Sequence, residues 1–183
     1  MTTTDGKGAS RRRRPSAIEF SILFGWHAVL SGAFIVAYLS GDEDTYAMHQ
    51  FAGYLVLAAI VVRLIAAICA PAGSPLRMPR PDVAKFRDWL SQGVRGTPTA
   101  LPRRPLLAMM AIVLLIGIGA TAGSGAVADF VPSVEAIHEA LGELALWLVI
   151  AHVAIVAALH GGARWWRRPR TVSASAFPHR GRP

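Results

Sequence analysis

Residues 137–160 read IHEALGELALWLVIAHVAIVAALH, an apolar stretch that contains three histidines. A stretch of this length can cross the hydrocarbon core of a bilayer as one helix, which needs about 20 residues. An imidazole inside the hydrocarbon costs free energy unless something binds it, so an ionisable residue there is a candidate functional residue. We therefore expect the partners of these histidines to reveal what the protein does.

The composition is that of a membrane protein. The 183 residues suffice for one domain, and they are 53% hydrophobic with a formal net charge of +8. The basic residues lie between long apolar runs rather than on one exposed face, which argues against nucleic acid as a partner. The single cysteine, Cys69, allows no internal disulfide and no cysteine-bound iron–sulfur cluster. We expect Cys69 to be a small buried apolar residue.

Four apolar segments predict four transmembrane helices and hence an all-α fold. They cover roughly residues 17–39, 47–70, 105–122 and 136–160, each close to the 17–25 residues that a spanning helix needs. We interpret the first as a retained span rather than a signal peptide, because its apolar run is long and no small-residue cleavage site follows. Short loops favour an up-down bundle. The predicted organisation is a four-helix domain at 17–163 between basic tails at 1–16 and 164–183.

The distribution of charge predicts the orientation in the membrane. All but one of the 19 lysines and arginines lie before the first helix, between the second and third helices, or after the fourth. The other two loops contain no lysine or arginine, and they carry Asp42, Glu43, Asp44, Asp129 and Glu135 instead. The positive-inside rule then places both termini in the cytoplasm.

The long basic loop contains the segment DVAKFRDWLSQGVRG at 82–96. Its apolar residues recur at helical intervals, so it is either a short amphipathic helix on the membrane surface or a partly ordered loop.

Four histidines form two pairs at two depths in such a bundle. His49 begins the second helix and His138 begins the fourth, and both helices start on the outer side. His27 and His152 lie at matching distances from the inner ends of the first and fourth helices. We call His49 and His138 the outer pair, and His27 and His152 the inner pair.

One face of the fourth helix carries a member of each pair. His138 and His152 are 14 residues apart, which is ~21 Å along a helix and only about 40° around it. A glycine follows one turn after each outer histidine, Gly53 after His49 and Gly142 after His138. The missing side chains leave room for a flat ligand.

Two imidazoles at each of two depths predict two haem irons with both axial positions filled, an arrangement suited to electron transfer. No C-x-x-C-H motif occurs, so the predicted cofactors are two non-covalent b haems. A structural zinc would need about four ligands at one depth, and a proton relay would need carboxylates among the histidines. The remaining alternative is that each histidine merely hydrogen-bonds a neighbouring helix.

Other polar and small residues in the spans fit this hypothesis. Arg63 is 14 residues after His49, at the level of the inner pair, and it would bind a haem propionate or extend to lipid phosphate. His160 lies at the membrane edge and is an interfacial residue, a propionate contact or part of a quinone pocket. The third helix has no histidine, and its glycines predict close packing or clearance beside the outer haem: Gly117, Gly119, Gly123 and Gly125.

Two segments resemble a known family. They are MHQFAGYLVLAAIVVRL at 48–64 and HEALGELALWLVIAHVAIVAALH at 138–160. They are similar to the bacterial cytochrome b561 group and the cytochrome b subunits of Ni/Fe hydrogenases, and the likeness extends over 17–163. Trp26 beside His27 is similar to that family's aromatic-flanked ligand. The resemblance implies a four-helix membrane protein that binds two b haems through its first, second and fourth helices. The segment LPRRPLL at 101–107 departs from the family's usual one, so no specific partner is implied.

The predicted function is therefore that of a di-haem b-type cytochrome, a multi-pass protein of the bacterial cytoplasmic (inner) membrane and its respiratory chain. It would pass electrons between the quinone pool and a periplasmic redox protein such as a c-type cytochrome. A quinone oxidoreductase and a membrane-anchor subunit of a larger oxidoreductase, such as a hydrogenase, would share this core, and a homodimer is compatible with both. A haem-free, histidine-lined membrane transporter is the alternative from a different class.

Overall fold

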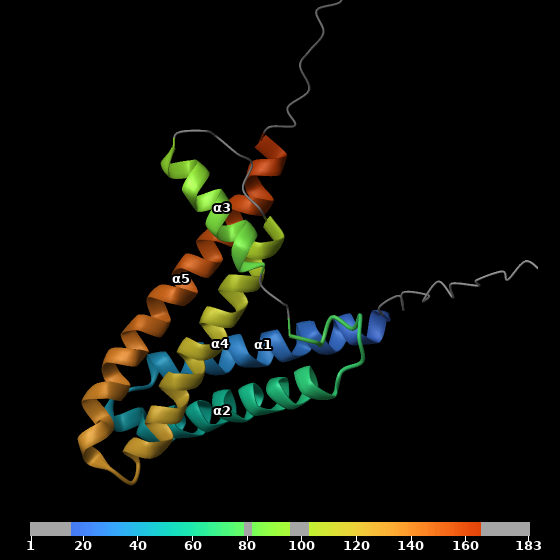
Figure 1. Ribbon diagram of the computed structural model, residues 1–183. Helices are drawn as coiled ribbons and strands as arrows, with labels where there is room; N and C mark the ends of the chain where they lie inside the picture. Colours follow the sequence, from blue (N-terminus) through green and yellow to red (C-terminus); the bar gives the residue numbers. More distant parts are fainter. Residues whose placement is uncertain (1–15, 79–81, 96–102, 166–183) are drawn as a thin grey trace, which may run out of the picture.

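The computed structural model describes residues 16–78, 82–95 and 103–165, and the regular elements in these ranges are all helices (Figure 1). The longer helices are α1 (Ala17–Leu39), α2 (Tyr46–Cys69), α3 (Val83–Val94), α4 (Arg103–Ala128) and α5 (Glu135–Trp165). Two short 3₁₀ helices, η1 (Glu43–Thr45) and η2 (Pro132–Val134), precede α2 and α5. The predicted basic tails lie almost entirely outside the described residues.

Four helices of the described chain are long and apolar enough to cross a membrane. The candidate spans are Ala17–Leu39, Glu43–Cys69, Pro105–Ala128 and Pro132–His160. This confirms the predicted all-α protein with four spans. A helix satisfies its own backbone hydrogen bonds, which is the condition for crossing hydrocarbon.

The helix ends follow from local chemistry and packing. Ser16 and Glu19 form a capping box, in which the Ser16 hydroxyl accepts from the Glu19 N–H at 3.2 Å and the Glu19 carboxylate accepts from the Ser16 N–H at 2.8 Å. The third span continues to Ala128 rather than ending near residue 122 as expected. Glycine and serine weaken this last stretch as a helix, but close packing against α5 keeps it helical.

The four spans form two hairpins. The contacts between helices are concentrated in α1 with α2, α4 with α5, and α2 with α4. Figure 1 shows the α1–α2 hairpin and the α4–α5 hairpin crossing at a wide angle. The buried core lies where they meet, and it consists of Leu30, Ala33, Phe34, Val56, Ala59, Ile60, Ile118 and Ala145.

Much of the remaining apolar surface faces outward. Phe24 and Ile65, for example, are 69% and 55% exposed. A bilayer accepts such side chains as readily as a protein core does, so outward-facing apolar residues are expected on membrane spans. Cys69, expected to be buried, is instead exposed at the last residue of α2, where the helix end leaves the core.

The amphipathic segment of the basic loop forms the helix α3. Val83, Leu90 and Val94 are exposed on it, and the rings of Phe86 and Trp89 lie with their centres 6.0 Å apart. The helical alternative is therefore the one observed, over Val83–Val94. A position of α3 on the membrane surface stays a prediction.

Candidate haem-binding site

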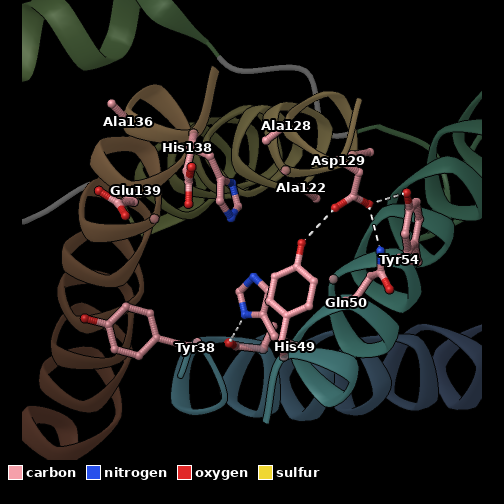
Figure 2. Close-up of a pocket in the computed structure, with 18 of the residues that line it drawn as sticks. Tyr38, His49, Gln50, Tyr54, Ala122, Ala128, Asp129, Ala136, His138 and Glu139 are labelled. Carbon is pink, nitrogen blue, oxygen red and sulfur yellow. Dashed lines mark hydrogen bonds between the residues drawn. The ribbon is translucent and has the colours of Figure 1, made fainter. Parts of the chain in front are cut away.

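The outer pair meets between the two hairpins. His49 comes from the first turn of α2 and His138 from the first turn of α5. Their ring centres are 5.9 Å apart, and the ring planes are inclined at 73°. Figure 2 shows the two imidazoles on opposite sides of a cavity, directed toward each other. The turn between α1 and α2 and the turn between α4 and α5 lie at the same end of the molecule (Figure 1), so α2 and α5 start at that end.

Hydrogen bonds fix the tautomer of both outer rings. The Nδ1 atom of His49 is 2.7 Å from the carbonyl oxygen of Ala37, and that of His138 is 3.0 Å from the carbonyl oxygen of Thr121. A carbonyl oxygen only accepts, so Nδ1 donates in each case, and in the neutral imidazole Nε2 then carries the lone pair. Histidines that bind metals are commonly held in this way by their other ring nitrogen. Both outer rings are thus prepared as Nε2 ligands.

A cavity of about 810 Å³ contains the outer pair, a volume in the range of cofactor sites. Gly53 and Gly142 line it, as expected from the H-x-x-x-G spacing. A Cβ atom at Gly53 would meet nothing within 4 Å, and one at Gly142 would meet only a methyl of Thr121 at 4.0 Å. The two glycines therefore border open space that larger side chains would fill.

A polar cluster that the sequence reasoning missed closes one side of this cavity. The Asp129 carboxylate, in the turn after α4, accepts from Tyr54 at 2.7 Å and from Tyr46 and Gln50 at 3.1 Å each (Figure 2). The hydrogen bond from Tyr54, followed by that from Gln50, lowers the pKa of Asp129 below its ordinary value. The spacing of residues 46, 50 and 54 at four-residue steps on α2 was the available signal, because such residues share one helix face.

The inner pair also meets between the hairpins. His27 of α1 and His152 of α5 have ring centres 6.3 Å apart and ring planes inclined at 83°. The Nδ1 atom of His152 is buried and has no hydrogen-bond partner among the described residues. A buried polar nitrogen without a partner is costly and indicates a missing ligand or water. The inner rings thus lie at a similar separation to the outer ones, but with less support from neighbouring carbonyls.

Arg63 lies at the level of the inner pair. Its side chain is buried, with 9% exposure. The guanidinium carbon lies 5.7 Å from the centre of the Trp26 ring, and one N–H donates to the carbonyl of Leu76. The Trp26 ring is in turn 6.2 Å from that of His27. Within the described chain Arg63 has no carboxylate partner, so a buried cation beside the inner pair lacks a neutralising anion.

His160 is not paired with another histidine in the described chain. Its Nδ1 atom bonds only the carbonyl oxygen of Val156, one turn earlier in α5, at 2.8 Å. The described residues also contain no group of three or more His, Cys, Asp or Glu side chains that could hold a metal ion. The side chains at this site that could bind a metal are therefore the two pairs of imidazoles.

The spacing of both pairs fits a metal bound between two imidazoles. With metal–nitrogen bonds of about 2 Å, ligands on opposite sides of one metal place their ring centres about 6 Å apart. The measured separations of 5.9 and 6.3 Å match that value. The prepared Nε2 atoms, the open space at the glycines and the unpaired nitrogen of His152 agree with haem as the group that the site accepts.

Comparison with known proteins also indicates haem as the bound group. A model of the prokaryotic cytochrome b561 family matches residues 16–173, which include all four spans. No curated protein and no solved structure matches the chain significantly. The match extends over well more than half of the sequence, so the chain belongs to the prokaryotic cytochrome b561 family, whose members are haem b-binding electron-transfer proteins of bacterial membranes.

Proposed function

We propose that the protein is a di-haem b-type cytochrome that transfers electrons across the cytoplasmic membrane between the quinone pool and a periplasmic redox partner. The observation that carries the proposal is the presence of two imidazole pairs at two levels, with ring centres 5.9 and 6.3 Å apart. His49 and His138 would hold the outer haem iron, and His27 and His152 the inner one.

The residues around each pair have separate tasks. A haem held by two histidines would supply one-electron transfer rather than oxygen binding. Gly53 and Gly142 leave the helix surface free for the flat macrocycle at the outer site. Arg63 supplies positive charge beside the inner site, and a propionate is the anion that we assign to its buried guanidinium.

Two sites at two levels provide a path across the bilayer. The histidines of α5 are 14 residues apart, which separates the ligand atoms by ~21 Å along the helix and the edges of the macrocycles by much less. The charge distribution of the loops supports placing the outer pair toward the periplasm and both termini in the cytoplasm. An electron donor or acceptor in the periplasm would then reach the outer site, and quinone in the membrane would complete the path.

The first test is a dithionite-reduced minus oxidised spectrum of the purified full-length protein, with a pyridine haemochrome assay for stoichiometry. We expect sharp b-type bands and about two haems per chain. One haem per chain would contradict the assignment of two ligand pairs. No haem after expression with adequate haem supply would contradict the proposal as a whole and favour a histidine-lined transporter.

A second experiment addresses the partner. Reduced quinol is mixed with the oxidised protein in vesicles, and reduction of the haem is followed by its absorption. Reduction by quinol supports a connection with the quinone pool. If quinol does not reduce the protein and oxidised quinone does not reoxidise it, the quinone part of the proposal is wrong, and a membrane-anchor subunit that exchanges electrons with a larger oxidoreductase becomes the better description.

A further inference from the structure

One turn of α4, a helix without histidine, contacts the ring of His138. The Nδ1 atom of His138 is 3.0 Å from the carbonyl oxygen of Thr121 and 3.3 Å from the hydroxyl oxygen of Ser124. The Ser124 hydroxyl itself donates to the Thr121 carbonyl at 2.9 Å, so its lone pairs are free to accept from the ring. Two oxygen atoms of one helical turn thus surround the N–H of the imidazole.

The same turn leaves space for the ring. A Cβ atom built at Gly125 would lie 2.8 Å from Cε1 and 3.1 Å from Nδ1 of His138. A real Cβ atom essentially never lies as close as 2.8 Å to a carbon atom of another residue, so a side chain at 125 would force the ring or the helix to shift. Gly123, two residues earlier in the same helix, differs, because a Cβ atom there would meet nothing within 4 Å.

A further contact holds the backbone that carries the ring. The hydroxyl of Thr121 lies 3.0 Å from the carbonyl oxygen of Leu141 in α5, three residues after His138. The hydroxyl is also 3.0 Å from the carbonyl oxygen of Gly117 in its own helix. Thr121 therefore fixes α5 through its side chain and the imidazole through its main chain.

The inner site has no comparable support in the described chain. His152 is on the same helix as His138, yet its Nδ1 atom is buried without a hydrogen-bond partner. Of the rings of His138 and His152, only that of His138 has hydrogen-bond acceptors for its Nδ1 atom in the described chain. This difference indicates that the residues around His138 are adapted to that ring.

We propose that Thr121, Ser124 and Gly125 form a socket on α4 that positions His138, directs its Nε2 atom toward His49, and sets the redox potential of the outer haem. This inference rests on the proposed function, because it takes His138 as a haem ligand. Ser124 and Gly125 are positioning residues that act through the imidazole. A stronger hydrogen bond at Nδ1 makes the ring a more basic ligand, which favours the oxidised iron.

The space at Gly125 is tested with a matched pair of variants, Gly125→Ala and Gly123→Ala. Haem per chain is measured by pyridine haemochrome, and the low-spin ferric signals are recorded by EPR. We expect Gly125→Ala to lose about half of the haem and one of the two EPR signals, whereas Gly123→Ala keeps both. Two haems with unchanged EPR signals in Gly125→Ala would overturn the proposal.

The hydrogen bond is tested with Ser124→Ala, which removes the hydroxyl oxygen without adding an atom beside the ring and remains informative even if Gly125→Ala does not accumulate. Potentiometric titration of the purified protein should show two haems, with the midpoint potential of one raised and the other unchanged. Ser124→Thr restores a hydroxyl and should return the potential toward its original value. Equal potentials in the original protein and Ser124→Ala would remove Ser124 from the socket.

The variant His138→Ala separates this inference from the proposed function. If it retains two haems, the ligand assignment is wrong and the socket loses its purpose. If it loses one haem while the Gly125 and Ser124 variants behave like the original protein, the ligand assignment stands and the socket is wrong.

Discussion

Asp129 accepts a hydrogen bond of 2.7 Å from the hydroxyl of Tyr54, although the two residues are 75 positions apart in the chain. Gln50 and Tyr46 donate to the same carboxylate, each at 3.1 Å. The cluster joins α2 to the turn between α4 and α5, and so links the two hairpins at the level of the outer pair. The ring of Tyr46 also stacks on that of His49, with centres 6.2 Å apart.

Replacing the carboxylate should weaken this link between the hairpins. We expect Asp129→Ala to lower the stability of the purified protein by about 1 kcal/mol, because the cluster is exposed to water and each hydrogen bond contributes little there. Thermal or detergent-induced unfolding measures the change. Asp44→Ala is the control, because the Asp44 side chain has no partner in the described chain, and an equal loss in both variants would contradict the role of the cluster.

The contribution of Asp129 should also depend on pH. Its pKa is lowered in the folded protein, chiefly by the hydrogen bond from Tyr54. The stabilisation is therefore present above the ordinary pKa of an aspartate and is lost as the pH falls through the lowered pKa of Asp129. We expect the difference in stability between the original protein and Asp129→Ala to be constant near neutral pH and to shrink in acid. A difference that grows in acid would have the wrong sign.

Loss of an inner histidine should remove one haem and leave the other. We predict that His152→Ala retains about half of the haem, because the outer pair does not include this ring. His160→Ala is the control on the same helix and should retain both haems, since His160 bonds only its own helix in the described chain. Unchanged haem content in His152→Ala would show that the histidines do not pair as proposed.

Removing the buried positive charge should make one haem harder to reduce. Arg63→Leu is expected to lower the midpoint potential of the inner haem more than that of the outer one, because a nearby cation favours the reduced iron. Arg63→Lys keeps the charge and should show a smaller shift. Equal shifts of both haems in potentiometric titration would count against a place for Arg63 beside the inner propionates.

The glycines of α4 should differ in their tolerance of a methyl group. A Cβ atom at Gly119 would contact Ile60 at 3.8 Å, an ordinary van der Waals distance, whereas one at Gly117 would lie 2.8 Å from Leu148. We expect Gly119→Ala to stabilise the protein by up to about 1 kcal/mol through helix propensity. In Gly117→Ala the shift of Leu148 should cancel or reverse that gain. Unfolding curves in which Gly117→Ala is the more stable variant would contradict this packing.

The levels of the histidines could be predicted from the sequence, because a helix rises by a constant amount per residue and the loop charges set the direction of each span. The atoms that accept hydrogen bonds from Nδ1 of His49 and His138 could not be predicted. They are the backbone carbonyls of Ala37 and Thr121, and because every residue has a backbone carbonyl, the sequence does not indicate which ones accept. The amino-acid sequence of α4 does not indicate that Gly125, rather than Gly123, faces an imidazole. That depends on the rotation of α4 against α5, which packing alone decides. The binding of haem by these particular histidines stays a prediction.

The arrangement of the spans in two hairpins affects how the stability of the protein would depend on haem. Each proposed haem takes one ligand from the α1–α2 hairpin and one from α5, so a bound haem would cross-link halves of the chain that otherwise meet mainly through α2 and α4. In a chain inserted into the membrane without haem, the two hairpins would have fewer connections and the histidines would have no bound group. Chains that are less stably folded are removed by proteases in cells, so the supply of haem would influence how much newly made protein accumulates.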